Sequence, residues 1–366
     1  MKNRIKFYQI GNGDTTLITT ESGKNILFDY AHLKNGDDDD LRCDLPSELN
    51  KDVTSDSFDV VAFTHADIDH VKRFSEYFYL EHASKYQAGV RKKITELWVP
   101  AHVILEEGCE DDTRILRAEA RYRLKNKSGI KVFSKPDNLK GWLEKEDIKF
   151  SDVEHLIVNA GQTVPGWDNS NPELEFFVHA PFSYYLDEHT EITRNDSSLV
   201  MQATFKNTYK TKLLLTGDAD WELLHEIVAI TERFENTGKL LWDIMHISHH
   251  CSYLSLAPEK GETKTEPVDP VRRLFEDYSL KGCILISPSY EIPLDYDTIQ
   301  PPHRQAFNYY KSVAEDKSGE IKILMEFPSK ANPKPLEITV DSQGATIVKT
   351  AVSSGFVSER KPPRAG

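Results

Sequence analysis

Cysteine is scarce in this sequence, and the few cysteines lie far apart. The 366 residues include only Cys43, Cys109, Cys251 and Cys283, and no two of them form a Cys-x-x-Cys pair. This spacing argues against a disulfide framework and against a zinc site built from thiolates. Scattered free thiols are typical of a reducing compartment, so we expect a cytoplasmic protein.

Long apolar runs are missing as well. No window approaches the roughly 18 apolar residues that a membrane-spanning helix needs. Residues 1–10 alternate charged and apolar side chains where a signal peptide needs an uninterrupted apolar segment. We therefore expect no membrane association and no secretion.

Basic residues are fewer than acidic residues. The chain has 45 basic and 59 acidic residues, for a net charge of -14, and such a surface repels the phosphate backbone of long nucleic acids. Two basic stretches, residues 91–93 and 121–135, are interpreted most simply as solvated surface. A nucleotide or nucleic-acid substrate would therefore need a local basic patch or bound metal ions, and a short, cyclic or end-bound phosphodiester suits this charge best.

Apolar and aromatic residues, by contrast, are plentiful. Hydrophobic residues make up 39% of the chain, with 17 Phe, 15 Tyr and 5 Trp, which is enough for a large packed interior. The chain exceeds the length at which a single core usually stops growing, but layered α/β hydrolases with insertions can remain one domain. We expect one domain over residues 1–350, with an insertion at about residues 105–150 and a flexible basic tail over residues 351–366.

Short β-prone runs bounded by glycine turns indicate sheets, and two stretches have helical spacing. The expected strands cover residues 5–10, 15–20, 26–28, 58–63, 97–100, 175–179, 199–205, 212–216, 242–247 and 284–287. The expected helices cover residues 71–80 and 221–234, and the stretch from residue 81 to 161 is mostly helical in pattern.

The strongest functional signal follows the expected strand at residues 58–63. The sequence Thr-His-Ala-Asp-Ile-Asp-His over residues 64–70 places four side chains that can bind metals on one loop, namely His65, Asp67, Asp69 and His70. Imidazole and carboxylate groups bind divalent ions, and a loop between a strand and a helix can direct alternate side chains to two neighbouring ions. The pattern therefore predicts a two-metal site.

This motif resembles the H-x-H-x-D-H signature of metallo-β-lactamase-fold hydrolases. It is more similar to the H-x-D-x-D-H variant in the hydrolase domain of ComEC-like competence proteins, a DNA-uptake family. Four further blocks resemble that variant in the same order: I-G-N-G-D at residues 10–14, N-D-S-S-L-V at 195–200, L-T-G-D at 215–218 and H-H-C-S at 249–252. The resemblance covers residues 5–252 and implies an α/β fold, a four-layer αββα sandwich with a helical insertion.

The resemblance also implies a first metal ion. Carried over position by position, His65, Asp67 and Asp196 would hold it, with Asp196 standing where many relatives have a histidine. Asp218 would bridge this ion to a second one, together with a water or hydroxide. Two such ions roughly 3.5 to 4 Å apart would acidify the shared water enough to attack a substrate.

The second implied ion would be held by Asp69, His70 and His250. His249 is the alternative to His250, and whichever of the two is not a ligand could orient the other. The aspartate-rich set of ligands favours manganese more than a histidine-rich set would, and zinc remains possible. The expected cofactors are thus two divalent ions, Zn or Mn.

Several positions depart from the family pattern or match it less well. Cys251 replaces the glycine of H-H-G-S and is either a soft extra ligand or a packing residue, and Tyr30 stands where a glycine usually follows the aspartate of the second strand. Pro-His-Arg at residues 302–304 resembles a G-H-P block. His303 either binds the scissile group or protonates the leaving group, or it is a surface histidine. The catalytic candidates are therefore Asp69, Asp218 and His303.

Three functions are compatible with these features. The first is a metal-dependent hydrolase that uses a metal-bridging hydroxide, as a phosphodiesterase or nuclease acting on nucleotides or nucleic acid, because the most similar variant belongs to proteins that handle DNA. The second is a hydrolase of a carboxylic ester, lactone or thioester, since a fold and a metal centre do not choose the substrate. The third, a non-enzymatic scaffold, is disfavoured because every expected ligand position is occupied.

Overall fold

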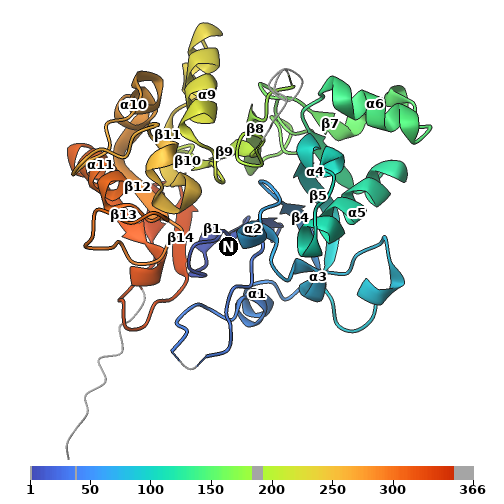
Figure 1. The fold of residues 1–366 in the computed structure, drawn as a ribbon, viewed down its shortest axis with the longest axis horizontal. Coiled ribbons are helices and arrows are strands. Elements are labelled where there is room, and N and C mark those ends of the chain that lie inside the picture. Colours follow the sequence, from blue (N-terminus) through green and yellow to red (C-terminus); the bar gives the residue numbers. More distant parts are fainter. Residues whose placement is uncertain (1, 38, 184–192, 350–366) are drawn as a thin grey trace, which may run out of the picture.

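A computed structural model of the chain describes residues 2–37, 39–183 and 193–349. In these residues two β-sheets lie face to face, and helices cover the outer face of each sheet. The blue-to-green part of the chain forms most of one sheet, to which the red end adds β14 and β15, and the yellow-green-to-orange part forms the other sheet (Figure 1). The predicted four-layer α/β sandwich is confirmed, while the predicted tail lies outside the described residues.

The first sheet has the strand order β15-β14-β1-β2-β3-β4-β5-β6-β7 among the described residues. Neighbours from β15 to β3 are antiparallel, and neighbours from β3 to β7 are parallel. The last two strands of the chain therefore pair beside the first one. The strands are β1 (Asn3–Phe7), β2 (Thr16–Thr19), β3 (Asn25–Phe28), β4 (Ser57–Ala62), β5 (Lys93–Pro100), β6 (Ile130–Phe133), β7 (Ile157–Val158), β14 (Leu336–Asp341) and β15 (Gly344–Ile347).

The second sheet has the order β13-β12-β11-β10-β9-β8. Neighbours from β8 to β10 are antiparallel, and neighbours from β10 to β13 are parallel. The strands are β8 (Leu174–Ala180), β9 (Val200–Phe205), β10 (Lys212–Leu215), β11 (Trp242–His246), β12 (Ser279–Ser287) and β13 (Glu320–Ile323).

Helices form the two outer layers. Those that follow strands of the first sheet are α1 (Leu45–Asp52), α2 (Ile68–Val71), α3 (Phe74–Tyr77), α4 (Ala101–Leu105), α5 (Asp111–Lys125), α6 (Asp137–Lys145) and α7 (Phe150–Val153). The second sheet is covered by α9 (Trp221–Arg233), α10 (Asp269–Glu276) and α11 (Arg304–Asp316). Short 3-10 helices cover Ser84–Tyr86, Glu154–Leu156, Thr237–Lys239, Ser248–Cys251, Tyr253–Ser255 and Leu324–Glu326. No described helix has the length and apolarity required to cross a membrane.

Three apolar cores separate these layers. The alternation of side chains along β1 sends Ile5 and Phe7 between the sheets, where they pack with residues such as Phe176 of β8 and Ile244 of β11. The other two cores lie between each sheet and its helices. Each fully buried side chain of this size contributes about 1.5–3 kcal/mol through the hydrophobic effect. The sandwich is therefore held from both faces of each sheet.

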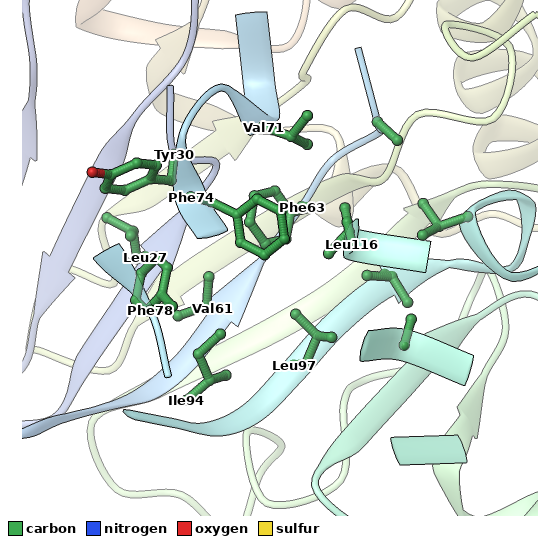
Figure 2. Packing of buried hydrophobic residues seen from close by; sticks show 14 of the residues in the cluster. Leu27, Tyr30, Val61, Phe63, Val71, Phe74, Phe78, Ile94, Leu97 and Leu116 are labelled. Atoms are coloured by element: carbon green, nitrogen blue, oxygen red, sulfur yellow. The ribbon is translucent and has the colours of Figure 1, made fainter. Parts of the chain in front are cut away.

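Figure 2 shows part of the core between the first sheet and its helices. Phe63, directly after β4, packs edge-on against Phe74 of α3 with ring centroids 5.3 Å apart, and Tyr30 packs against Phe78 at 5.5 Å. Both Phe63 and Phe74 are fully buried. This aromatic packing fixes the chain immediately before and after the motif at residues 64–70.

The helix predicted over residues 71–80 is wrong in its extent. The structure has two four-residue helices, α2 and α3, separated by Arg73 in a left-handed conformation with φ 61°. From Phe78 the chain is extended and bridges to Lys92. The apolar spacing of Val71, Phe74 and Phe78 fits one helix, but it is equally satisfied by two single turns packed on the same core.

The stretch predicted as a helical insertion at about residues 105–150 forms part of the first sheet and of the helical layer that covers it. It contains α5 and α6, and between them β6, which pairs with β5 and β7 inside the first sheet. Leu116, Ala120 and Leu124 of α5 are fully buried in the core over that sheet. The charged sequence around β6 obscured this strand.

Candidate metal centre

The predicted site residues lie at the ends of strands from both sheets. His65 follows β4, Asp218 follows β10, and His250 follows β11. The amide of Leu199, directly before β9, donates to the carbonyl of Thr64 at 2.8 Å, so the two sheets meet at the loop of residues 64–70. Residues that are far apart in the sequence therefore converge at one edge of the sandwich.

Gly217 permits this convergence. It has φ 51°, and a Cβ atom at this position would lie 2.9 Å from Cβ of Thr64. A side chain would push the β10 loop away from the loop that carries His65, so the glycine of L-T-G-D is required by close packing as well as by its left-handed backbone.

Asp218 lies at the middle of the cluster. Its Oδ1 is 3.3 Å from Nε2 of His70, and its Oδ2 is 3.4 Å from Nε2 of His250 and 3.9 Å from Nε2 of His65. One buried carboxylate thus faces three imidazole rings. This is the arrangement expected of a residue shared between two ions.

Four of the predicted residues form one compact set. Oδ2 of Asp69 is 3.1 Å from Nε2 of His250, and the possible ligand atoms of Asp69, His70, Asp218 and His250 all lie within 4.8 Å of one another. Nε2 of His70 and Oδ1 of Asp218 are buried without a hydrogen-bond partner. Buried polar atoms usually have partners, so these atoms fit a metal ion, and the donor set of carboxylates and imidazoles is one that divalent metals accept.

The other half of the predicted centre is more open. Nε2 of His65 is buried, has no hydrogen-bond partner and lies 3.4 Å from Oδ2 of Asp67. The Asp67 side chain is 36% exposed, and its other oxygen, Oδ1, accepts a hydrogen bond from Nη1 of Arg194 at 2.7 Å. The structure thus brings His65, Asp67 and Asp218 together, with an arginine on the outer side of Asp67.

Asp196 is turned elsewhere. It belongs to neither of the compact ligand clusters found among the described residues. Its Oδ2 accepts from the amide of Thr193 at 2.8 Å, and its carboxyl group lies beside that of Asp220. Burial, together with the negative charge of Asp196, raises the pKa of Asp220 to about 7. The predicted place of Asp196 with His65 and Asp67 therefore remains a prediction.

The backbone conformation places the side chains of the two adjacent histidines differently. His249, His250 and Cys251 all have left-handed conformations, with φ of 49°, 52° and 66°. Nδ1 of His250 donates to the carbonyl of Pro288 at 2.9 Å, which turns Nε2 toward the carboxylates. His249 belongs to neither of the compact clusters found among the described residues, and its Nδ1 is buried without a hydrogen-bond partner. Strained backbone of this kind costs about 1–3 kcal/mol per residue and is typical of functional sites.

Asp29 was not predicted as a site residue. Its Oδ2 accepts from Nδ1 of His70 at 2.9 Å, and its carboxylate also accepts from the amide and the hydroxyl of Thr64, each at 2.7 Å. A carboxylate behind a histidine fixes the ring so that the opposite nitrogen can bind a metal. The signal in the sequence was an aspartate at the end of a short apolar strand.

Asp14 was missed as well. It is buried, and its carboxylate lies 3.4 Å from Nε2 of His246, 3.7 Å from Nδ1 of His250 and 3.9 Å from Nδ1 of His70. With Asp29 and His70 it forms a second compact cluster. Asp14 ends the I-G-N-G-D turn, so the resemblance marked its position, but nothing in the sequence indicated that the turn lies behind the loop of residues 64–70.

The charges of the cluster shift the pKa values of its members. Burial by itself lowers the pKa of His70 and of His250, but the nearby carboxylates, Asp218 above all, raise both well above the usual value. Burial opposes ionisation of Asp218, but His250 and His70 hold its pKa well below the usual value. The cluster is thus a strongly negative, buried environment that binds protons when no other cation is present.

The remaining predicted residues are packed or hydrogen-bonded, and the catalytic role predicted for His303 stays a prediction. His303 is buried: Nδ1 accepts from the amide of Tyr253 at 3.4 Å, and Nε2 donates to the carbonyl of Ile299 at 3.2 Å, so the alternative of a surface histidine is wrong. Cys251 is buried in the core under α9 to α11, and burial raises the pKa of its thiol to about 12. Tyr30 stacks on Tyr77 with ring centroids 5.2 Å apart.

No protein-family model and no curated protein matches this chain. Solved structures with a similar arrangement include the metallo-beta-lactamase fold protein YhfI from Bacillus subtilis, with 12% identity, a TM-score of 0.44, and coverage of 92% of this chain and 99% of that one. A diphosphatase from the PhnP family has 8% identity, a TM-score of 0.34 and coverage of 78% and 86%. Zn(2+)-bound PqqB from Methylobacterium extorquens has 8% identity, a TM-score of 0.37 and coverage of 87% and 97%. With similarities this loose, the chemistry of the cluster has to be inferred from its own residues.

Proposed function

We propose that the protein is a metal-dependent hydrolase whose substrate is a phosphodiester of a nucleotide or nucleic acid. The observation that carries this proposal is the position of Asp218. One of its oxygens faces His70, and the other faces His65 and His250, at 3.3 to 3.9 Å. A carboxylate facing ligand atoms on both sides suits a pair of divalent ions.

The surrounding residues are suited to hold two such ions. His65, Asp67 and Asp218 would hold the first, and Asp69, His70, Asp218 and His250 the second. When bound, divalent ions in such a site lower the pKa of water and neutralise negative charge on the group under attack. The carboxylate-rich donor set suits manganese, and zinc is the alternative.

Other residues of the chain keep the ligand atoms in place. Asp29 fixes the ring of His70, and the carbonyl of Pro288 fixes the ring of His250. Both histidines are nearly fully buried, whereas Asp67 and Asp69 have 36% and 30% of their side chains exposed. A substrate would therefore approach over the edge formed by Asp67 and Asp69.

A phosphodiester is favoured over a carboxylic ester for two reasons. The five sequence blocks are most similar to the hydrolase domain of a family that handles DNA, and the guanidinium of Arg194 lies beside the exposed ligand Asp67. The net charge of -14 argues against a grip on long duplexes. We therefore propose a short or single-stranded phosphodiester substrate.

The test compares substrates and metals on purified protein. Metal-free protein is supplied with Mn or Zn and offered bis-p-nitrophenyl phosphate, p-nitrophenyl acetate and a labelled single-stranded oligonucleotide. Metal-dependent cleavage of a phosphodiester is expected, with loss of turnover in Asp218→Asn and full turnover in the control Asp56→Asn, which changes an exposed aspartate. Turnover of the acetate alone would reject the phosphodiester, and a protein that neither binds metal nor cleaves any substrate would be a scaffold.

A further inference from the structure

Arg194 connects the predicted metal loop to a part of the chain whose purpose the sequence did not reveal. Its Nη1 donates to Oδ1 of Asp67 at 2.7 Å. Its Nε donates to both carboxylate oxygens of Glu106, at 3.0 and 3.2 Å, and its Nη2 donates to the same group. The guanidinium is thus held between two carboxylates from different elements.

The contact with Asp67 leaves one oxygen of the carboxylate for a metal. Oδ1 is taken by Arg194, while Oδ2 points to Nε2 of His65 at 3.4 Å. The Asp67 side chain has 36% of its surface open to solvent, compared with 1% for His65 and 4% for Asp218. Without a partner on Oδ1, a side chain as exposed as this one would sample other rotamers and carry Oδ2 away from His65.

Glu106 belongs to the segment that packs against the predicted metal loop. It follows α4 directly, and the start of α5 lies against the same loop: the hydroxyl of Thr113 donates to the carbonyl of Ala66 at 2.7 Å. Asp112 accepts from the amide of Arg73, at 2.8 Å, on the far side of the loop. The start of α5 therefore fixes the backbone around the predicted metal loop, and Glu106, in the connection between α4 and α5, anchors the arginine that contacts Asp67.

We infer that Arg194 is a positioning residue for Asp67 at the first-ion half of the centre, and that Glu106 holds it in place. The inference rests on the proposed function, because it assigns Arg194 a role toward a bound ion. Groups that hydrogen-bond to metal ligands typically account for about 10–100-fold in metal affinity. Arg194 is expected to act on one of the two ions, since its hydrogen bonds go to Asp67 and Glu106, and neither of these residues is assigned to the second ion.

The opposite effect is the main competing outcome. A guanidinium carries a full positive charge, and a charge close to a divalent ion opposes its binding. If repulsion exceeded positioning, removing Arg194 would strengthen metal binding. The sign of the change in affinity therefore decides between a positioning residue and a competitor for Asp67.

The experiment is a titration of metal-free full-length protein with Mn followed by calorimetry and by the electron paramagnetic resonance of bound Mn. The wild type is expected to bind two ions. In Arg194→Ala, one of the two binding events is expected to weaken by about 10–100-fold while the other is unchanged. Arg194→Lys keeps the charge but not the planar fork, so part of the loss is expected to remain.

Two further variants complete the test. Glu106→Gln should weaken the same binding event by a smaller factor, because Arg194 loses its charged anchor. Arg121→Ala is the matched control: Arg121 donates to the carbonyl of Ile104 and to Glu107 but has no contact with Asp67, so both affinities should be unchanged.

The outcomes separate this inference from the proposed function. A wild type that binds no ions contradicts both. A wild type that binds two ions, with Arg194→Ala binding both unchanged, or either one more tightly, overturns the inference alone. Equal weakening of both ions in a variant with wild-type thermal unfolding overturns it as well. If Arg194→Ala does not fold, Arg194→Lys and Glu106→Gln carry the same expectations.

Discussion

Replacement of Asp218 by asparagine is the most direct perturbation of the centre. Asn has the same shape but no negative charge, so the packing of the β10 loop is preserved. The three imidazole nitrogens at 3.3, 3.4 and 3.9 Å from its oxygens would lose the carboxylate that they share. Asp218→Asn therefore tests charge and coordination without creating a cavity.

The expected magnitude differs between the metal-free and the metal-bound protein. Removing one partner of a buried, paired charge costs about 3–5 kcal/mol, and Asp218 is buried with protonated histidines as partners. The entropy of unfolding is about 2.1 cal/mol/K per residue, or about 0.8 kcal/mol/K for 366 residues. The midpoint of thermal unfolding of the metal-free variant should thus fall by about 4–7 °C.

Metal binding should suffer more. A lost hydrogen-bond partner of a ligand already costs about 10–100-fold in affinity, and Asp218 faces both sets of ligands directly, so each ion should bind at least about 100-fold more weakly. Elemental analysis and calorimetric titration measure this effect, and differential scanning calorimetry in chelator measures the first one. Two ions bound with wild-type affinity would refute the assignment of Asp218 as a shared ligand.

Two other predictions concern the protonation of the buried histidines and the backbone at Cys251. The pKa values of His70 and His250 are raised in the folded metal-free protein, so protonation of these histidines stabilises the folded state. This stabilisation is complete below the unfolded-state pKa of about 6.5. It is lost as the pH rises through the raised folded-state values. In chelator, the midpoint temperature of thermal unfolding should therefore decrease as the pH is raised above about 6.5. Metal-saturated protein should not show this decrease. An increase of the metal-free midpoint temperature with pH would contradict the pKa shifts. At Cys251, where φ is 66°, glycine should change the free energy of unfolding by less than about 1 kcal/mol, because relief of backbone strain offsets lost packing, whereas valine should destabilise by about 2 kcal/mol or more. Urea unfolding of Cys251→Gly and Cys251→Val measures this difference, and equal stability of the two variants would exclude the left-handed conformation.

Local sequence patterns predicted most of the strands. β4 is predicted by the compact apolar run before the motif at residues 64–70, and β8 to β11 are predicted by their β-branched and apolar runs. The helix α9 was predicted to within one residue, since its buried stripe has helical spacing. β6 and the break at Arg73 were not predicted, because charged flanks and a single left-handed residue leave no periodic trace.

The residues of the candidate site were likewise predicted only in part from local sequence. His65, Asp69 and His70 are close in the sequence, so their gathering was visible in the motif, and Asp218 and His250 were added by the resemblance. The choice of His250 over His249 in the compact cluster is a matter of backbone dihedral angles and of a hydrogen bond to Pro288.

The sequence by itself determined most strands and the loop of possible metal ligands at residues 64–70, because strand periodicity and ligand spacing are local properties, and the resemblance to a known family added the layered α/β class. Only the tertiary structure placed Asp29 and Asp14 behind the histidines, turned Asp196 toward Asp220, and brought Arg194 and Glu106 to Asp67. These contacts join residues from distant segments, and they exist only because strands of two sheets end at the same edge of the sandwich. A side chain's partner across such an edge is set by packing of the whole chain, which no local pattern records.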